Sequence, residues 1–153
     1  MTSVLSCMLP LCSFAMEKEA PHPLVETTQQ YVNFINRLNK GEDFAQHDVA
    51  ATLLAPDCKK IFNGTVFSQS RQAFVDDLVA LQRTLGSWHL RPADIILSQE
   101  KNVVVVRLFV DMEKGGHYTE IVIFRFNSEG LIQELNIVFN KIEEGYHFEG
   151  EQE

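Results

Sequence analysis

The last third of the chain carries two runs of β-branched and aromatic residues joined by a Gly-Gly turn, and this feature restricts the fold most. The runs are residues 102–112 and 118–126, with the turn at residues 113–116. Glycine adopts positive φ at little cost, so such a turn between such runs indicates a β-hairpin. A third run, residues 131–139, follows the turn at residues 127–130. We therefore expect an antiparallel meander.

Two helices are predicted in the first third of the chain. Apolar residues recur at intervals of four and three between a proline and a glycine, which predicts a helix that begins at Pro23 and ends at Gly41. A shorter helix is expected over residues 43–54, because Pro56 cannot continue it.

A short hairpin and a third helix lead into the meander. The Asn63-Gly64 pair predicts a tight turn within residues 59–67. Apolar residues at helical spacing then predict a helix that opens near Ser70 and closes at Gly86. The expected order is two helices, a hairpin, a helix and a meander.

The composition fits one globular domain, which we place at residues 17–143. The chain has 153 residues, of which 45% are hydrophobic, enough for one ordinary core. Its formal net charge of −8 and the lack of a basic run argue against binding to nucleic acid or to an anionic membrane surface.

The two ends differ from this domain. Residues 1–16 form an apolar, uncharged leader, which is either a weak signal-like segment or a mis-assigned start with Met16 as the true first residue. Residues 144–153 form an acidic tail. A cytoplasmic location is expected, and secretion is the alternative if residues 1–15 are a signal peptide.

No metal site and no cofactor are expected. Cys7, Cys12 and Cys58 form no CxxC pair, and the five histidines lack zinc-ligand spacing. The sequence also lacks a glycine-rich phosphate loop and a nucleophile elbow. Any chemistry would therefore rest on carboxylates and phenols.

The order of elements and two stretches of sequence resemble the nuclear transport factor 2-like (NTF2-like) superfamily, in its SnoaL-like and ketosteroid-isomerase-like branch. The stretches are NRLNKGEDFAQHDVAATLLAPD and VIFRFNSEGLIQELNIVF, and the resemblance covers residues 23–142. It implies an α+β fold in which a cone-shaped, curved antiparallel sheet packs on N-terminal helices, a cystatin-like roll. It also implies a pocket inside the cone and, commonly, a homodimer. The reaction stays open, because this superfamily hosts isomerases, dehydratases, cyclases, hydrolases and binding modules.

The groups that ketosteroid isomerases use are missing at the matching positions. Phe34 stands where the resemblance places a hydrogen-bonding tyrosine, and Tyr31 lies one turn earlier. No carboxylate stands near Phe62 and Asn63, where the general base is implied, and Val122 takes the place of the protonated acid. Proton abstraction beside a carbonyl needs such a base and such donors. Steroid-type isomerisation is therefore not expected.

Strand parity predicts which side chains line the pocket. If Glu113 pairs with Gly116 across the hairpin, then Asp111 lies opposite Tyr118, and every second residue of both runs shares their face. The resemblance turns this same face toward the pocket. The expected lining is Val105, Arg107, Phe109, Asp111, Tyr118, Glu120, Val122, Phe124 and Phe126.

Four polar side chains on this face are the candidate site residues. We expect Asp111 or Glu120 to act as general acid/base and Tyr118 to donate a hydrogen bond. Arg107 would hold a carboxylate or an enolate. The alternative is a structural ion pair between Arg107 and Glu120, with Asp111 and Tyr118 solvated at the hairpin tip. Further ligand contacts are expected from Phe34, Tyr31, Trp88, Phe109, Val122 and Phe124.

The same register leaves an apolar outer face on the hairpin. An apolar sheet face of that size is not left open to water on a soluble monomer. We therefore expect a homodimer through the outer face of the sheet. The residues of this face would be Val104, Val106, Leu108, Val110, Ile121 and Ile123.

Two functions fit the sequence. The first is a SnoaL-like protein that binds a small, largely apolar molecule in the cone pocket, with cofactor-free acid/base chemistry of isomerase, cyclase or hydrolase type as an option. The second is a non-catalytic homodimeric interaction module whose cone is filled by its own side chains. An open cavity would favour the first and a solid core the second. The filling residues would be Phe34, Phe109, Phe124, Phe126 and Phe139.

Overall fold

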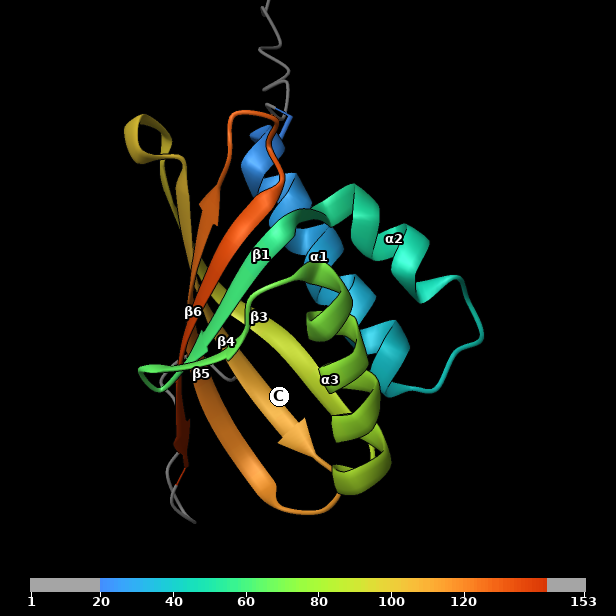
Figure 1. Cartoon of the computed structure of the whole chain (residues 1–153). Helices are drawn as coiled ribbons and strands as arrows, with labels where there is room; N and C mark the ends of the chain where they lie inside the picture. The colour runs from blue at the N-terminus through green and yellow to red at the C-terminus, as the bar shows by residue number, and fades with distance from the viewer. Residues whose placement is uncertain (1–19, 143–153) are drawn as a thin grey trace, which may run out of the picture.

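The computed structural model describes residues 20–142, and the predicted leader and acidic tail lie outside them. The described residues form an α+β fold in which three helices cover one side of a curved six-stranded sheet (Figure 1). No helix within residues 20–142 is long and apolar enough to cross a membrane. The elements are α1 (Pro23–Asn39), α2 (Gln46–Leu53), β1 (Leu54–Phe62), β2 (Thr65–Ser68), α3 (Arg71–Leu85), β3 (Trp88–Ser98), the 3-10 turn η1 (Gln99–Lys101), β4 (Val103–Met112), β5 (Gly116–Phe126) and β6 (Ile132–Lys141).

The ends of α1 and α3 follow the predicted signals. Helix α1 begins at Pro23, and the chain leaves it through Gly41, which has φ 69°. The Ser70 side chain accepts a hydrogen bond from the backbone N–H of Ala73 at 3.2 Å and so caps α3. Gly86 ends that helix with φ 79°.

Helix α2 and strand β1 differ from the prediction. The helix starts only at Gln46, and β1 follows directly at Leu54, so that Pro56 lies inside a strand instead of ending a helix. The pairing of β1 with β6 is irregular between Leu54 and Lys59, and such an irregularity accommodates a residue without an N–H donor. The Asn63-Gly64 turn between β1 and β2 is confirmed, with φ 46° and 81°.

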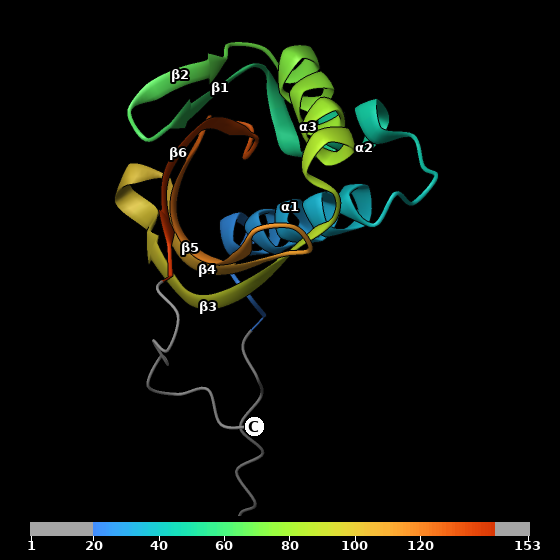
Figure 2. The ribbon, with the colours of Figure 1, turned by 90° about the horizontal axis from the view of Figure 1, so that it is seen from below.

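The sheet is mixed, which the expectation of an antiparallel sheet did not include. Its strand order is β2-β1-β6-β5-β4-β3, and β1 runs parallel to β6 while the other neighbours are antiparallel. Seen along its length, the sheet curls around α1, with α3 across the open side (Figure 2). The core between sheet and helices includes the fully buried side chains of Phe34, Phe74, Phe124, Leu54, Leu108, Ile132 and Leu135.

The predicted register of the β4–β5 hairpin is wrong by one residue. Met112, not Glu113, pairs with Gly116, because the loop has three residues and ends at Gly115, which has φ 151°. Three-residue loops with a glycine in a positive-φ position are a common hairpin connection. A shift of one residue moves every side chain of a strand to the other face. The inward side chains of β4 are therefore Val104, Val106, Leu108 and Val110, and those of β5 are Tyr118, Glu120, Val122, Phe124 and Phe126.

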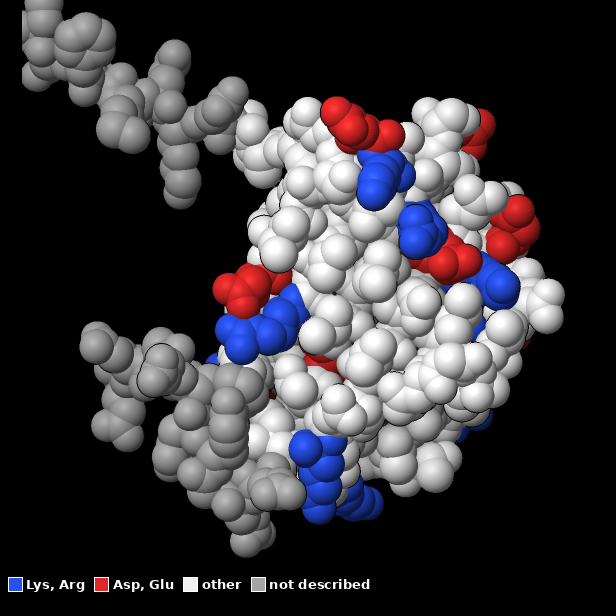
Figure 3. All heavy atoms as spheres, turned by 90° about the vertical axis from the view of Figure 1, so that its left-hand side faces the viewer, with Lys and Arg blue, Asp and Glu red and all other residues white. Residues whose placement is uncertain are grey.

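The outer face of the sheet consequently differs from the predicted one. It carries Val105, Arg107, Phe109 and Asp111 from β4, while the four aliphatic residues predicted there are buried inside. Ile121 and Ile123 were predicted correctly on the outer face, where they pair with Arg107 and Val105. Figure 3 shows this side of the molecule, where uncharged surface is interrupted by neighbouring acidic and basic side chains. The exposed apolar side chains of the outer face are Val66, Ile96, Ile121 and Val138.

Candidate functional site

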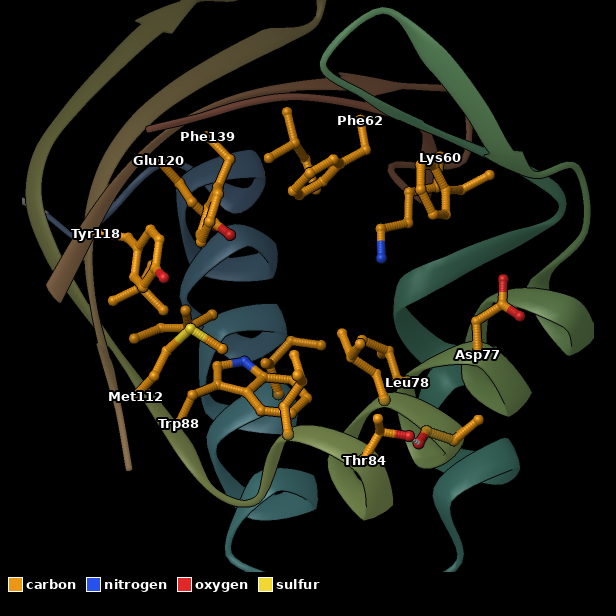
Figure 4. Close-up of a pocket in the computed structure, with 18 of the residues that line it drawn as sticks. Lys60, Phe62, Asp77, Leu78, Thr84, Trp88, Met112, Tyr118, Glu120 and Phe139 are labelled. Atoms are coloured by element: carbon orange, nitrogen blue, oxygen red, sulfur yellow. Dashed lines mark hydrogen bonds between the residues drawn. The ribbon is translucent and has the colours of Figure 1, made fainter. Parts of the chain in front are cut away.

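A cavity of about 630 Å³ lies between the concave face of the sheet and the helices α1 and α3 (Figure 4). This volume is in the range of small-molecule pockets. Phe34 and Phe124 are packed in the core, so they do not fill it. The exposed side chains of Phe67 and Leu81 also line the cavity and therefore mark its mouth. The apolar lining includes Ile35, Phe62, Leu78, Trp88, Leu90, Val110, Met112, Ile137 and Phe139.

Two charged side chains enter this apolar cavity from opposite sides. Figure 4 shows the Glu120 carboxyl group pointing inward from β5 and the Lys60 amine pointing inward from β1. Among the ion pairs of residues 20–142, none joins Lys60 to Glu120, so the amine and the carboxyl group are not in direct contact. The titratable side chains that line the cavity are Tyr31, Lys60, Asp77, Lys114, Tyr118 and Glu120.

Glu120 is a carboxyl group held in apolar surroundings. It pairs with Leu108 on one neighbouring strand and with Phe139 on the other. Burial raises the pKa of the Glu120 carboxyl from 4.5 to about 7, although the positive charge of Lys60 acts in the opposite direction. Within residues 20–142 no group donates a hydrogen bond to this carboxyl that would stabilise its charge. Glu120 can therefore accept or donate a proton near neutral pH.

Lys60 is the buried cation of the cavity. Its residue is only 9% exposed, and its Nζ atom lies 5.3 Å from the centroid of the Phe74 ring. Burial lowers the pKa of the Lys60 amine below its ordinary value of 10.5, and the negative charges of Glu120 and Asp77 oppose this change. Because the amine reaches the cavity, a bound molecule can contact it directly.

Two phenols complete the polar lining. Tyr31 on α1 is buried, with its ring 5.3 Å from the ring of Phe124. Burial and the nearby charge of Glu120 raise the pKa of the Tyr31 phenol well above 10.0, so this group stays a hydrogen-bond donor. Tyr118 on β5 stacks on Phe139, with ring centroids 4.6 Å apart. Both phenols are thus fixed by aromatic packing.

Arg107 and Asp111 lie outside the cavity, contrary to the prediction. Arg107 forms an ion pair with Asp94 at 2.7 Å, so the predicted pair between Arg107 and Glu120 is wrong. Asp111 accepts hydrogen bonds from Arg91 at 2.9 Å and from His117 at 2.7 Å. The cause is the one-residue difference in hairpin register, which turns these side chains to the outer face.

These outer residues form a compact cluster of their own. The guanidinium groups of Arg91 and Arg107 each lie 5.4 Å from the centroid of the Phe109 ring. Partial burial raises the pKa of Asp111, but the hydrogen bonds from His117 and Arg91 outweigh it and lower the pKa below 3.8. Phe109 is only 7% exposed on this face. The cluster therefore links neighbouring strands on the outer face of the sheet.

The other predicted site residues divide into three groups. The predicted catalytic residues Tyr118 and Glu120 and the predicted ligand contacts Tyr31 and Trp88 line the cavity. Three predicted ligand contacts are packed in the core and do not line it: Phe34, Val122 and Phe124. The predicted contact Phe109 lies on the outer face.

Sequence reasoning missed Lys60 and Asp77. Lys60 lies two residues after the buried Cys58 on β1. Side chains two residues apart on a strand share a face, so strand alternation predicts that Lys60 faces inward. Asp77 stands on the exposed side of α3 next to the buried Leu78 and reaches the cavity edge, which helical spacing alone does not reveal.

Burial raises the pKa of the Cys58 thiol to about 12, which makes it unsuited as a nucleophile. No group of three or more metal-ligating side chains occurs within residues 20–142.

The chain matches no family model, and no curated protein matches its sequence. Solved structures do match its fold. A SnoaL-like family protein from Agrobacterium tumefaciens, proposed to be an isomerase, is 13% identical, with 78% of this chain and 98% of that chain covered and a TM-score of 0.60. A protein from Sinorhizobium meliloti, proposed to be a polyketide cyclase, is 18% identical, with 76% and 99% covered and a TM-score of 0.60.

A third similar structure has no assigned function. It is a protein with a cystatin-like fold from Methylobium petroleophilum, 13% identical, with 81% of this chain and 80% of that chain covered and a TM-score of 0.64. At these identities the likeness concerns the fold. The chain has the fold of the SnoaL-like, NTF2-like and cystatin-fold proteins, as the sequence resemblance predicted.

Proposed function

We propose that this protein binds a small, largely apolar molecule in its cavity and transfers a proton to or from it through Glu120. The observation that carries the proposal is a carboxyl group inside an apolar cavity with its pKa raised to about 7. A general acid/base works best when its pKa lies near the working pH. Carboxyl groups perturbed by burial in a pocket are also typical of functional sites.

The other polar groups of the cavity fit complementary roles. When the Glu120 carboxylate removes a proton from a carbon next to a carbonyl group, negative charge develops on the carbonyl oxygen. The Lys60 ammonium and the phenols of Tyr31 and Tyr118 are the donors available to stabilise that charge. Proton transfer of this kind serves isomerase and cyclase reactions, whereas in a hydrolase reaction the same carboxylate would take a proton from the attacking water. Two of the similar structures are proposed to be an isomerase and a polyketide cyclase.

A cofactor-free proton abstraction from a neutral probe tests this proposal without knowledge of the substrate. Nitrobenzisoxazole opens to a coloured phenolate when a base removes its ring C–H proton. We expect catalysis whose rate rises with pH through about 7, as Glu120 ionises. Replacement Glu120→Gln should lower the rate by a factor on the order of 10²–10⁴.

Glu134→Gln is the matched control. This acid lies on the outer face, 3.3 Å from Arg125, and does not line the cavity. The control should keep the full rate. If Glu120→Gln also keeps it, Glu120 is not the base.

The non-catalytic module with a filled cone has less support from the interior. Phe139 lines the open cavity, while Phe34, Phe124 and Phe126 are buried around it and Phe109 lies on the outer face. A cavity of about 630 Å³ is more than a packed interior leaves empty. Binding of a small molecule therefore remains the proposal.

A further inference from the structure

We propose that the cavity selects apolar carboxylic acids and binds them as anions, with the ligand carboxylate on Lys60. This inference rests on the proposed function, since it names the class of molecule that the cavity takes. It is carried by one geometric fact, a lysine that is only 9% exposed and whose amine faces an apolar cavity large enough for such an acid.

Lys60 lacks a strong partner among the described residues. Its Nζ atom lies 5.3 Å from the centroid of the Phe74 ring, and no carboxylate within residues 20–142 comes within ion-pair distance of it. A buried ammonium group with unfilled donor capacity is costly, and a ligand carboxylate would supply charge-assisted hydrogen bonds. An uncharged carbonyl group would supply weaker ones.

The rest of the cavity sets the apolar part of the ligand. Aromatic and aliphatic walls surround the amine and would bury a hydrocarbon chain or ring. Lys114, the other cation of the lining, is exposed on the β4–β5 loop. Its charge is screened by water, so it discriminates less than Lys60. The apolar walls of the cavity include Phe62, Leu78, Trp88, Ile137 and Phe139.

Binding of an anion should be linked to proton uptake at Glu120. With Glu120 neutral, Lys60 carries the uncompensated charge of the interior, whereas an ionised Glu120 opposes the ligand carboxylate. The other titratable groups facing the cavity are the donor phenols of Tyr31 and Tyr118 and the side chains of Asp77 and Lys114, which are exposed to solvent. Affinity should therefore be highest below about pH 7 and fall above it.

Trp88 provides a direct readout, because it is the one tryptophan of the sequence and it lines the cavity. Its fluorescence can be titrated with decanoate and with decanamide, an uncharged molecule of nearly the same shape. We expect decanoate to bind at least about tenfold more tightly at about pH 6, as one charge-assisted hydrogen bond would give. The preference should shrink at about pH 8 in the unmodified protein and persist in Glu120→Gln.

Lys60→Met should remove the preference, because the variant loses a charge-assisted hydrogen bond to decanoate but only a weaker hydrogen bond to the decanamide carbonyl. Lys59→Met is the matched control, since Lys59 is the neighbouring residue on β1 and does not line the cavity. That control should keep the preference. The comparison of two ligands on the unmodified protein does not depend on any variant folding correctly.

The outcomes separate the two proposals. Equal affinity for decanoate and decanamide would overturn the selection of carboxylic acids and leave binding of apolar molecules in place. A lack of any Trp88 response to both would count against the proposed function as well. A preference for decanoate that survives Lys60→Met would overturn the role of Lys60.

Discussion

Met112 pairs with Gly116 across the β4–β5 hairpin, and this pairing decides which acids reach the cavity. It places Glu120 opposite the buried Leu108 on the inner face. It also places Asp111 opposite His117 on the outer face. The two acids that the sequence offered as alternatives for one role therefore lie on opposite faces of the sheet.

Asp111→Asn should reduce stability without affecting proton transfer. The substitution weakens the contacts with Arg91 and His117, and such partly exposed pairs contribute about 1 kcal/mol or less to the free energy of unfolding. Because the pKa of Asp111 is lowered in the folded protein, its contribution is present above about pH 4 and is lost as the pH falls through the folded pKa. Urea unfolding at neutral and acidic pH measures both effects. A loss of probe turnover in this variant would contradict the assignment to the outer face.

The sequence predicted the elements of this fold well, because most signals were local. Pro23 at the first helical position and the capping residues Ser70 and Gly86 act through their immediate neighbours, and the structure has helix ends at each. The Asn63-Gly64 turn is local in the same sense. Such signals need no knowledge of the tertiary structure.

The candidate site was predicted only in part, because it depends on register and on contacts between distant segments. A Gly-Gly turn is compatible with hairpin loops of two or three residues. The structure has a three-residue loop where a two-residue loop was predicted, and this change exchanges the inner and outer faces of β4. Lys60 escaped notice for a different reason. Lys60 and Glu120 line the same cavity only because β1 joins the sheet beside β6, a parallel pairing that no local pattern in the sequence predicts.

Glu120→Gln should stabilise the protein at and above neutral pH. Since the pKa of Glu120 is about 7 in the folded protein against 4.5 ordinarily, its stabilising contribution is full below about pH 4.5 and is lost as the pH rises through about 7. Glutamine does not ionise, so the variant avoids this loss, which amounts to at most about 3 kcal/mol. Unfolding curves of both proteins between about pH 5 and pH 8 should therefore diverge as the pH rises. Parallel curves would mean that Glu120 is not perturbed.

Tyr118→Phe should distinguish the role of the Tyr118 hydroxyl group from the role of its aromatic ring. The variant keeps the stacking on Phe139 but loses the hydroxyl group, so we expect unchanged stability and a rate of probe turnover lowered by about tenfold. Tyr118→Ala loses the stacking too and should lower the free energy of unfolding by about 1 kcal/mol or more. Stability loss in the phenylalanine variant, with an unchanged rate, would show that the hydroxyl group has only a structural role.

We propose that two copies of the chain associate through the outer face of the sheet. Four apolar side chains are exposed there, Val66 at 42%, Ile96 at 66%, Ile121 at 45% and Val138 at 46%. A symmetric dimer would cover them. Ile121→Lys should convert the dimer to a monomer in size-exclusion chromatography with light scattering at micromolar concentration, whereas Glu129→Lys, on the exposed β5–β6 turn, should not. A monomeric unmodified protein would refute the proposal.

The ionisation of Glu120 itself is the most direct test of the account, because both the proposed chemistry and the selection of anions depend on it. Protein labelled with carbon-13 at the glutamate carboxyl carbons can be titrated by NMR, and the resonance missing from Glu120→Gln identifies this residue. We predict a midpoint near pH 7, well above the ordinary value of 4.5. A midpoint near 4.5 would show that the Glu120 carboxylate is fully ionised at neutral pH and would contradict the assignment of Glu120 as the proton-transfer group.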